Sequence, residues 1–370
     1  MRVAIIDPFL DTSHAYWANG IIQHSRHDIT PYYNKPKHWK WQMIGGTLEL
    51  AEKIRSDIES FDLLLVTDML DLACFLGYLS HKRSPRVIIY FHENQITYPW
   101  SPKDPDPSKN RDHHYGFMNL RSAYLADHIV FNSRYHKKSF YSALPKFKNQ
   151  FPSINWPIDE DKLLKQTSIL PIGLERRIPD IKNQDETPVF VWNHRWEYDK
   201  GPDQFFQILF QLKERGIHFK IVVLGKPYPQ QPAIFKRAKK ELKDEILHWG
   251  YVERKEEYYL KLSLANIALV TGHQDFFGIS VIEAIQMGCF PLLPNRLAYP
   301  EHLPNAENDF ALYEEHELIP KLIKIIERKY YLSTEHYSDY ITKYQWDNII
   351  GSYDLLFEGI ASQKESNILG

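Results

Sequence analysis

Two carboxylates and a glycine stand close together in segment 271–283, which reads TGHQDFFGISVIE. The segment begins at the end of a predicted strand and runs directly into a predicted helix, with Gly278 just before the first turn. A helix N-terminus favours anions, because its first N–H groups lack partners and the helix dipole is positive there. Ser280 and Glu283 also have the spacing of a capping box. The segment predicts an anion site at which Asp275 and Glu283 face one ligand, unless Glu283 only closes the capping box and Asp275 is solvated.

Two cations follow another predicted strand, in segment 191–201, which reads VWNHRWEYDKG. Arg195 carries a planar guanidinium fork and Lys200 a compact ammonium group, and together they could clamp a diphosphate. Cations beside a helix N-terminus suit a diphosphate that gains negative charge as a bond to it breaks. Surface arginines and lysines are common, so this pair is weak evidence by itself. Combined with segment 271–283, it predicts a diphosphate site.

Short apolar runs alternate with segments of helical periodicity along the chain. The strands predicted in the first half are Val3–Ile6, Leu63–Thr67, Val87–Phe91, His128–Phe131 and Ile169–Pro171. Those predicted in the second half are Val189–Asn193, Phe219–Leu224, Ile267–Thr271 and Phe290–Leu293, with helices at Pro202–Arg215, Ala233–Leu247, Glu256–Ser263 and Ser280–Met287. This alternation is typical of doubly wound parallel sheets, which bind ligands at the carboxyl ends of their strands. We expect an α/β protein with two Rossmann-like domains facing a central cleft.

The donor segments resemble those of retaining GT-B glycosyltransferases of family 4, which use nucleotide-diphosphate sugars without a metal. The resemblance rests on Arg195 with Lys200, the run Asp275–Ile279, and Glu283. The family has a glutamate where this chain has Asp275, which is shorter by one methylene. The resemblance implies that Asp275 contacts the sugar and Glu283 the ribose. The donor-binding residues it implies are Gly225, Gly250, Tyr251, Phe277, Gly278, Ile279 and Glu283.

Three motifs in the first half resemble the queuosine-tRNA mannosyltransferase-like subfamily. They are Pro8–Gly20 (PFLDTSHAYWANG), Phe91–Trp100 (FHENQITYPW) and Phe131–Tyr135 (FNSRY). The Gly-Gly-Ser-His loop of that family is Asp-Thr-Ser-His here, and His92 matches the histidine that meets the sugar near the reacting carbon. The acceptor-binding residues implied are Ser13, His14, Trp17, Glu93, Asn94, Gln95, Tyr98, Asn132 and Ser133. The catalytic residues implied are His92, Arg195, Lys200 and Asp275.

The resemblance implies transfer of a hexose, namely mannose from GDP-mannose, to queuosine in tRNA with retention of configuration. It implies no cofactor and no metal, the nucleotide sugar being the donor substrate. The alternatives are a lipid or glycan acceptor, or a non-catalytic nucleotide-sugar-binding protein. We place the acceptor-binding domain at residues 1–178 and the nucleotide-sugar-binding domain at 185–345, around a polar linker at 176–188. The helix in 346–370 is expected to pack back on the N-terminal domain.

Charge composition limits how a tRNA could be bound. Forty-five Lys and Arg oppose 47 Asp and Glu among 370 residues, so a strongly basic nucleic-acid binder is excluded and phosphate must be met locally. Segment 132–149 has five cations and no acid, and Lys35, Lys37 and Lys40 lie among Trp39 and Trp41. Basic residues interleaved with aromatic ones favour RNA contact, although ordinary surface lysines are the alternative.

Other chemistry is disfavoured by the sequence. The first residues lack the apolar core of a signal peptide and no run is long enough to span a bilayer, which predicts a cytoplasmic protein without stable membrane association. Cys74 and Cys289 lie in apolar contexts and are expected to be reduced core residues. The cluster at 112–114 (DHH), with Asp104 and Asp106 nearby, lacks the i, i+4 spacing of metal ligands, and the Pro-rich stretch Trp100–Pro107 is expected to be a surface loop.

Overall fold

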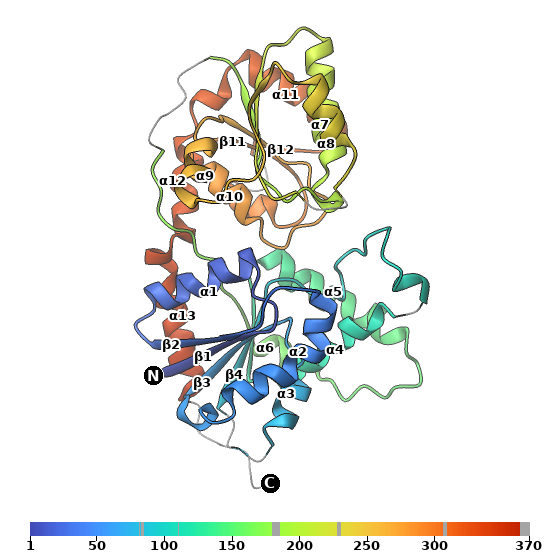
Figure 1. Cartoon of the computed structure of the whole chain (residues 1–370), viewed down its shortest axis with the longest axis vertical. Coiled ribbons are helices and arrows are strands. Elements are labelled where there is room, and N and C mark those ends of the chain that lie inside the picture. The colour runs from blue at the N-terminus through green and yellow to red at the C-terminus, as the bar shows by residue number, and fades with distance from the viewer. Residues whose placement is uncertain are drawn as a thin grey trace. The chain divides into compact units, whose positions relative to one another are not determined.

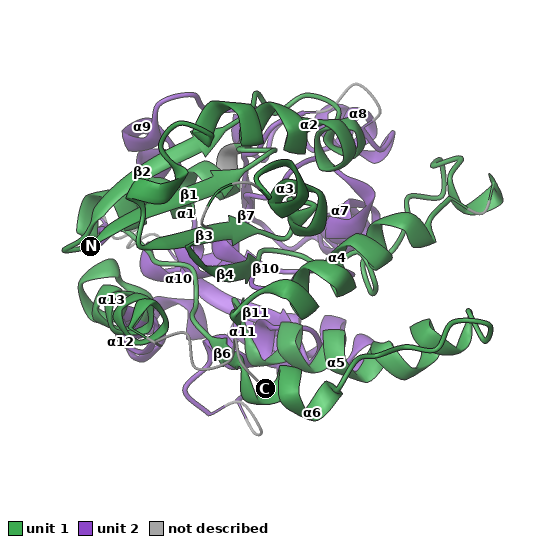
Figure 2. Ribbon diagram, turned by 90° about the horizontal axis from the view of Figure 1, so that it is seen from below, with its two compact units in different colours: residues 1–175, 344–370 green, residues 176–343 purple. Residues whose placement is uncertain are grey.

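The computed structural model describes residues 1–80, 82, 85–109, 111–179, 186–227, 231–305 and 309–362. They form two compact units, which Figure 2 shows in different colours. Unit 1 comprises residues 1–175 and the C-terminal segment from Tyr344, and unit 2 comprises residues 176–343. Each unit is built on a six-stranded parallel sheet flanked by helices (Figure 1).

The sheet of unit 1 has the strand order β2-β1-β3-β4-β5-β6. Its strands are β1 (Arg2–Asp7), β2 (Asp28–Tyr33), β3 (Leu63–Thr67), β4 (Arg86–Phe91), β5 (His128–Phe131) and β6 (Thr167–Ile169). Its helices are α1 (Thr12–His24), α2 (Trp39–Ile54), α3 (Leu72–Tyr78), α4 (His113–Leu125), α5 (Arg134–Asn149), α6 (Glu160–Lys165) and α13 (Trp346–Ala361). Every residue of β3 is buried, because helices cover both faces of a parallel sheet, and its sequence LLLVT is therefore a continuous apolar run.

The C-terminal helix α13 belongs to unit 1, where it packs on α1, β3 and β4. Its first residue, Trp346, is fully buried between two glycines. A Cβ atom on Gly20 or on Gly173 would lie 2.1 Å from the indole ring. Glycine at both positions thus makes room for the largest side chain on α13.

The sheet of unit 2 has the order β12-β11-β10-β7-β8-β9. Its strands are β7 (Val189–Trp192), β8 (Lys220–Val223), β9 (Ile246–Trp249), β10 (Ile267–Leu269), β11 (Phe290–Pro294) and β12 (Leu312–Tyr313). Its helices are α7 (Pro202–Glu214), α8 (Ile234–Glu241), α9 (Lys255–Leu262), α10 (Ile279–Gln286), α11 (Leu318–Glu327) and α12 (Glu335–Ile341), with short 3-10 turns such as η3 (Tyr198–Lys200).

The edge strands β9 and β2 differ from the sequence predictions. The helix predicted over Ala233–Leu247 ends at Glu241, and residues 246–249 form the edge strand β9, which pairs with β8. Strand β2 was not predicted, because it is an edge strand that carries a proline and is only partly buried. Edge strands lack the apolar run that marks a central strand, so pairing with the sheet decides their conformation.

The two cysteines have different environments. Cys289 is buried, as predicted, and burial raises the pKa of its thiol to about 12. Cys74, on α3, is exposed, so its prediction as a core residue is wrong. The apolar neighbours of Cys74 in the sequence face the core, whereas its own position on the short helix faces outward.

The glycine pair around Trp346 gives a stability test. Gly20→Ala should lower the free energy of unfolding by about 2 kcal/mol, because the added methyl group overpacks a filled core. Gly45→Ala is the matched control: Gly45 also lies within a helix of unit 1, but its Cβ would meet nothing within 4 Å. It should be neutral or stabilise by up to about 1 kcal/mol. Urea unfolding followed by circular dichroism measures both, and equal midpoints would contradict the packing argument.

Candidate functional site

The predicted anion site of unit 2 lies where the chain passes from β10 into α10. Gly278 occupies the position before the helix with φ of 83°, a left-handed conformation that favours glycine, and Ile279 is the first helical residue. Among the described residues, no side chain accepts a hydrogen bond as the N-cap of α10. The backbone around Gly278 and Ile279 is thus arranged as an anion site would require.

The predicted capping box of Ser280 and Glu283 does not form. The Glu283 carboxylate instead accepts hydrogen bonds of 2.9 Å from the hydroxyls of Tyr258 and Tyr259. Burial raises the pKa of Glu283, and the two tyrosine donors oppose that shift. Ser280 Oγ is hydrogen-bonded to His194 Nδ1 at 2.8 Å. The tertiary fold places two tyrosines of α9 next to Glu283. Their hydroxyls bind the carboxylate that the local sequence predicted would cap the N-terminus of α10.

Lys200 and Asp275 come together, as the prediction of one site requires. The Lys200 ammonium donates to the Gln274 carbonyl at 2.8 Å and to Asp275 Oδ2 at 3.3 Å. Asp199, only 2% exposed, lies 3.3 Å from the same ammonium. Burial by itself would lower the pKa of Lys200, but the carboxylates of Asp275 and Asp199 outweigh burial and raise it. A buried ammonium group with a raised pKa therefore lies next to the loop that leads into α10.

Backbone contacts bring the loops of this site together. Gly201 follows Lys200 with φ of 68°, and a Cβ atom there would lie 2.2 Å from the Thr271 carbonyl oxygen. At Gly225, after β8, a Cβ atom would lie 1.9 Å from the His194 carbonyl oxygen. Both glycines permit a close approach of backbone that any side chain would block. Gly225 therefore contributes to the site by positioning the loop that holds His194.

The remaining predicted donor residues have varied surroundings. Arg195 is 43% exposed at its side chain and pairs with Glu197 at 3.2 Å. Tyr251 is 52% exposed after Gly250, so its ring is accessible. The Phe277 ring is buried edge-on against His302, and this residue can meet a ligand through its backbone but not through its ring.

Two further residues of this site were not identified from the sequence. His194 lies inside segment 191–201, and burial, followed by the Lys200 charge, lowers its pKa to about 4. Tyr299, in a turn after β11, lies with its hydroxyl 3.4 Å from Asp275 Oδ2. His194 could have been predicted, because it lies in the same segment as Arg195 and Lys200. No sequence pattern around Tyr299 indicates that it lies in this site.

A second group of polar side chains lies at the carboxyl ends of β1, β3 and β4 in unit 1. His14 Nδ1 lies 2.7 Å from Asp7 Oδ2, and the His14 ring stacks on His92 with centroids 4.0 Å apart. The backbone N–H of His92 donates to Asp68 Oδ1 at 2.8 Å. His14, in the first turn of α1, and His92, directly after β4, are thus brought together at the carboxyl edge of the sheet.

Trp17 corrects the list of predicted acceptor residues. Its side chain is wholly buried, with its indole N–H donating to the Tyr353 hydroxyl, so it cannot stack on an unpaired base. The apolar face of α1 has to cover the sheet, and Trp17 lies on that face.

Three other predicted acceptor residues are buried and support the backbone. Asn132 donates to the His92 carbonyl at 2.9 Å, Ser133 caps α5, and Asn94 accepts from Thr97 in the loop after β4. The predicted acceptor residues with accessible side chains are Ser13, Glu93, Gln95 and Tyr98. Gln95 donates to the Glu93 carboxylate at 2.7 Å.

The predicted basic surface is partly neutralised. Most of segment 132–149 forms α5, where Arg134, Lys138 and Lys146 are exposed and Lys148 pairs with Glu160. Lys40 forms ion pairs with Asp104 and Asp106, so these two carboxylates neutralise its charge. Trp39 packs near Trp100 and Tyr115, while Trp41 is 70% exposed.

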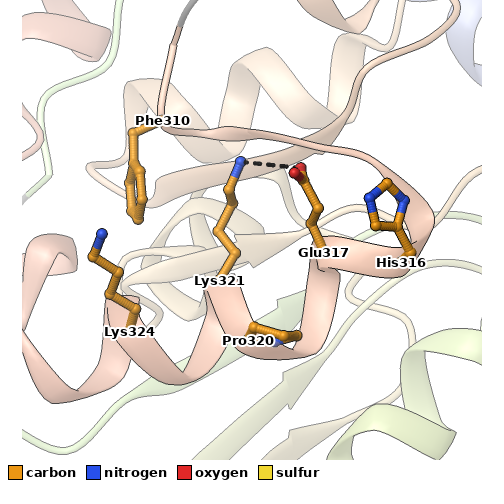
Figure 3. Close-up of a pocket in the computed structure, with 6 residues that line it drawn as sticks. All are labelled: Phe310, His316, Glu317, Pro320, Lys321 and Lys324. Carbon is orange, nitrogen blue, oxygen red and sulfur yellow. Dashed lines mark ion pairs between the residues drawn. The ribbon is translucent and has the colours of Figure 1, made fainter.

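Three further features concern metal binding, membrane spans and cavities in the part of the chain that the structure describes. Those residues contain no group of three His, Cys, Asp or Glu side chains that could hold a metal ion. None of the helices they form is both long and apolar enough to cross a membrane. A cavity of about 440 Å³ in unit 2 lies beside α11 and is lined by residues outside the predicted site (Figure 3): Phe310, His316, Glu317, Pro320, Lys321 and Lys324.

Comparison with known proteins decides the family. Residues 2–174 match the family described as tRNA-queuosine alpha-mannosyltransferase N-terminal, and residues 175–344 match glycosyl transferases group 1. A Drosophila melanogaster protein named tRNA-queuosine alpha-mannosyltransferase is 32% identical over 315 residues, which cover 82% of each chain. The chain belongs to the tRNA-queuosine alpha-mannosyltransferase family. The predicted resemblance and the assignment as a glycosyltransferase are thereby confirmed.

Solved structures agree with the predicted fold of this family member. Anabaena Alr3699/HepE in complex with UDP superposes with a TM-score of 0.65 at 12% identity, over 97% of this chain and all of that one (100%). Sucrose-phosphate synthase of Thermosynechococcus elongatus superposes with a TM-score of 0.69 at 13% identity, over 97% and 98% of the two chains. At such identities the likeness shows the fold alone, which is the predicted α/β GT-B fold.

The buried charges around Lys200 give a test of the donor site. Lys200→Met should lower the free energy of unfolding by about 3 kcal/mol, because it leaves the buried Asp199 carboxylate without its cation. Arg195→Met removes a cation from the same loop at an exposed position and should change stability by less than about 0.5 kcal/mol. Adding Asp199→Asn to Lys200→Met should restore part of the loss. Urea unfolding measures all three, and equal losses in the two single variants would contradict the assignment.

Proposed function

We propose that this protein transfers mannose from GDP-mannose to queuosine in tRNA, with retention of anomeric configuration. The observation that carries the proposal is the Drosophila relative of that name, which matches 82% of this chain. Matches to both the N-terminal family and the group 1 transferases support the same activity, because each half of the chain contributes one. A cytoplasmic location accords with a tRNA acceptor.

The donor site supports this proposal through its charges. Glycosyl transfer passes through an oxocarbenium-like state in which negative charge develops on the departing diphosphate. Lys200 and Arg195, with the N–H groups at Gly278 and Ile279, would stabilise that charge. Because Lys200 is held in place before the reaction, little reorganisation is needed as the charge develops.

The two carboxylates of unit 2 suit the sugar and the ribose. Asp275 is fixed by Lys200 and Tyr299 and would accept hydrogen bonds from sugar hydroxyls. Both oxygens of Glu283 already accept from tyrosines, but each carboxylate oxygen has a second lone pair for a ribose hydroxyl. The accessible ring of Tyr251 would line the base.

Retention follows from a same-face substitution assisted by the leaving phosphate. A double displacement would need a carboxylate that can attack the sugar carbon. Near His92, Asp7 is buried in its pair with His14, and Asp68 is wholly buried, which leaves neither placed as a nucleophile. The resemblance to retaining GT-B transferases of family 4, more than this burial, favours the same-face route.

The acceptor is tested by labelling tRNA. Radiolabelled mannose from GDP-mannose should enter tRNA from cells that contain queuosine and should not enter tRNA from cells that lack it, because only the former carries the cyclopentenediol acceptor. UDP- and ADP-sugars with the same tRNA serve as donor controls. Equal labelling of both tRNA pools would contradict the proposed acceptor, as would labelling of a lipid or glycan fraction while tRNA stays unlabelled.

Metal independence is tested by chelation. Transfer should continue at an unchanged initial rate in excess EDTA, because Lys200 and Arg195 supply positive charge to the diphosphate. The assay buffer should contain monovalent salt and spermidine, so that the tRNA stays folded without Mg²⁺. If EDTA abolished transfer and Mn²⁺ or Mg²⁺ restored it, the metal-free mechanism would be wrong.

A further inference from the structure

The ring of His92 is held on several sides by polar and aromatic groups of unit 1. His14 stacks on it with an interplanar angle of 23°, and Trp17 meets it edge-on with centroids 4.7 Å apart. Asp68 accepts the His92 backbone N–H. The orientation of the ring is thus determined by β1, α1, β3 and β4 together.

The Nε2 atom of His92 is buried and has no hydrogen-bond partner among the residues that the structure describes. A buried nitrogen left without a partner is unusual in a native protein and points to a group that arrives with a ligand. A neutral imidazole presents one N–H donor and one lone pair, whereas an imidazolium presents two donors and no lone pair. The protonation state of His92 therefore decides what it can bind.

The Asp7–His14 pair places a positive charge against the face of this ring. Burial by itself would lower the pKa of His14, but the Asp7 carboxylate outweighs it through charge and hydrogen bonding, and the pKa rises to about 10. This shift favours the imidazolium form of His14 at neutral pH. Burial, then the charge of His14, lowers the pKa of His92 well below its usual value.

The other titratable groups near the two rings come from the surrounding elements: Asp11, Asp68, Tyr90, Glu93, His136 and Tyr353. Burial raises the pKa of Asp68 and Tyr90 and lowers that of His136, so each of these favours its neutral form. Burial likewise raises the pKa of Tyr353. The cation stacked on His92 is therefore His14.

We propose that Asp7 and His14 are positioning residues whose ion pair keeps His92 neutral and correctly oriented to exchange a hydrogen bond with a substrate hydroxyl. This inference rests on the proposed glycosyl transfer for its kinetic consequence, but the charge state of His14 can be tested without it. The role differs from the acceptor contact expected of His14, because His14 is buried and acts through His92.

The charge state is measured by NMR on the full chain labelled with ¹⁵N-histidine, the signals being assigned by His14→Phe and His92→Phe. In the parent, both ring nitrogens of His14 should carry protons from pH 6 to 9, while His92 is neutral. In Asp7→Asn, His14 should become neutral near pH 7.5, because its counter-ion is gone. A neutral His14 in the parent at pH 7.5, or an unchanged His14 in Asp7→Asn, would overturn the proposal.

The kinetic test uses His14→Phe, which keeps a stacked ring but removes the charge. We expect kcat for mannosyl transfer to fall about tenfold or more, as when partners that orient metal-bound histidines are removed, with KM for GDP-mannose little changed. The acid limb of the pH–rate profile should move to higher pH, because the pKa of His92 rises once the cation is removed. A profile identical to that of the parent would overturn the proposal.

His128→Phe is the matched control. His128 is the first residue of β5, so it lies at the edge of the sheet opposite to the carboxyl edge that holds His92, and it is hydrogen-bonded to Ser168 at 2.9 Å. It should keep the parent rate and pH profile. If the parent transfers no mannose, the proposed function fails, whereas the NMR result still decides the charge of His14.

Discussion

In each unit all the strands run parallel, so every strand ends at the same edge of its sheet. Loops that are far apart in sequence therefore meet there. In unit 1 this edge collects Asp7, Asp68 and His92, which follow or end β1, β3 and β4. In unit 2 it collects the loops after β7 and β10, which carry Lys200 and Asp275. The chemistry of both units depends on this one constraint of chain direction.

Polar groups gathered at such an edge are partly covered by helices, and burial then controls their charges. Lys200 remains charged because Asp199 and Asp275 compensate for its desolvation. The Asp7 carboxylate likewise raises the pKa of His14, to about 10. His194 and His92, which lack a carboxylate partner of comparable strength, are kept neutral by burial and by the neighbouring cation. In each unit a buried basic group whose pKa is raised by carboxylates lies near a histidine whose pKa is lowered.

Close backbone approach allows these edges to pack tightly. Gly201 lies against the Thr271 carbonyl and Gly225 against the His194 carbonyl, so the loop after β7 touches both neighbouring loops. Such contacts cost little at glycine and are impossible at other residues. Glycines also leave room for the buried Trp346 ring, which packs between Gly20 and Gly173. This packing holds the C-terminal helix against the rest of unit 1.

The sequence by itself determined the central strands and predicted that Lys200 and Asp275 share one site, where the structure places them 3.3 Å apart. Leu63–Thr67 and His128–Phe131 match β3 and β5 at both ends, because strands buried on both faces are continuous apolar runs. Lys200 and Asp275 were recognised because each follows such a strand. Tertiary structure decided the rest. It made β9 a strand where helical periodicity was predicted, turned Glu283 toward two tyrosines, and buried Trp17. Edge pairing, hydrogen-bond partners and burial all depend on residues distant in sequence, so no local spacing could specify them.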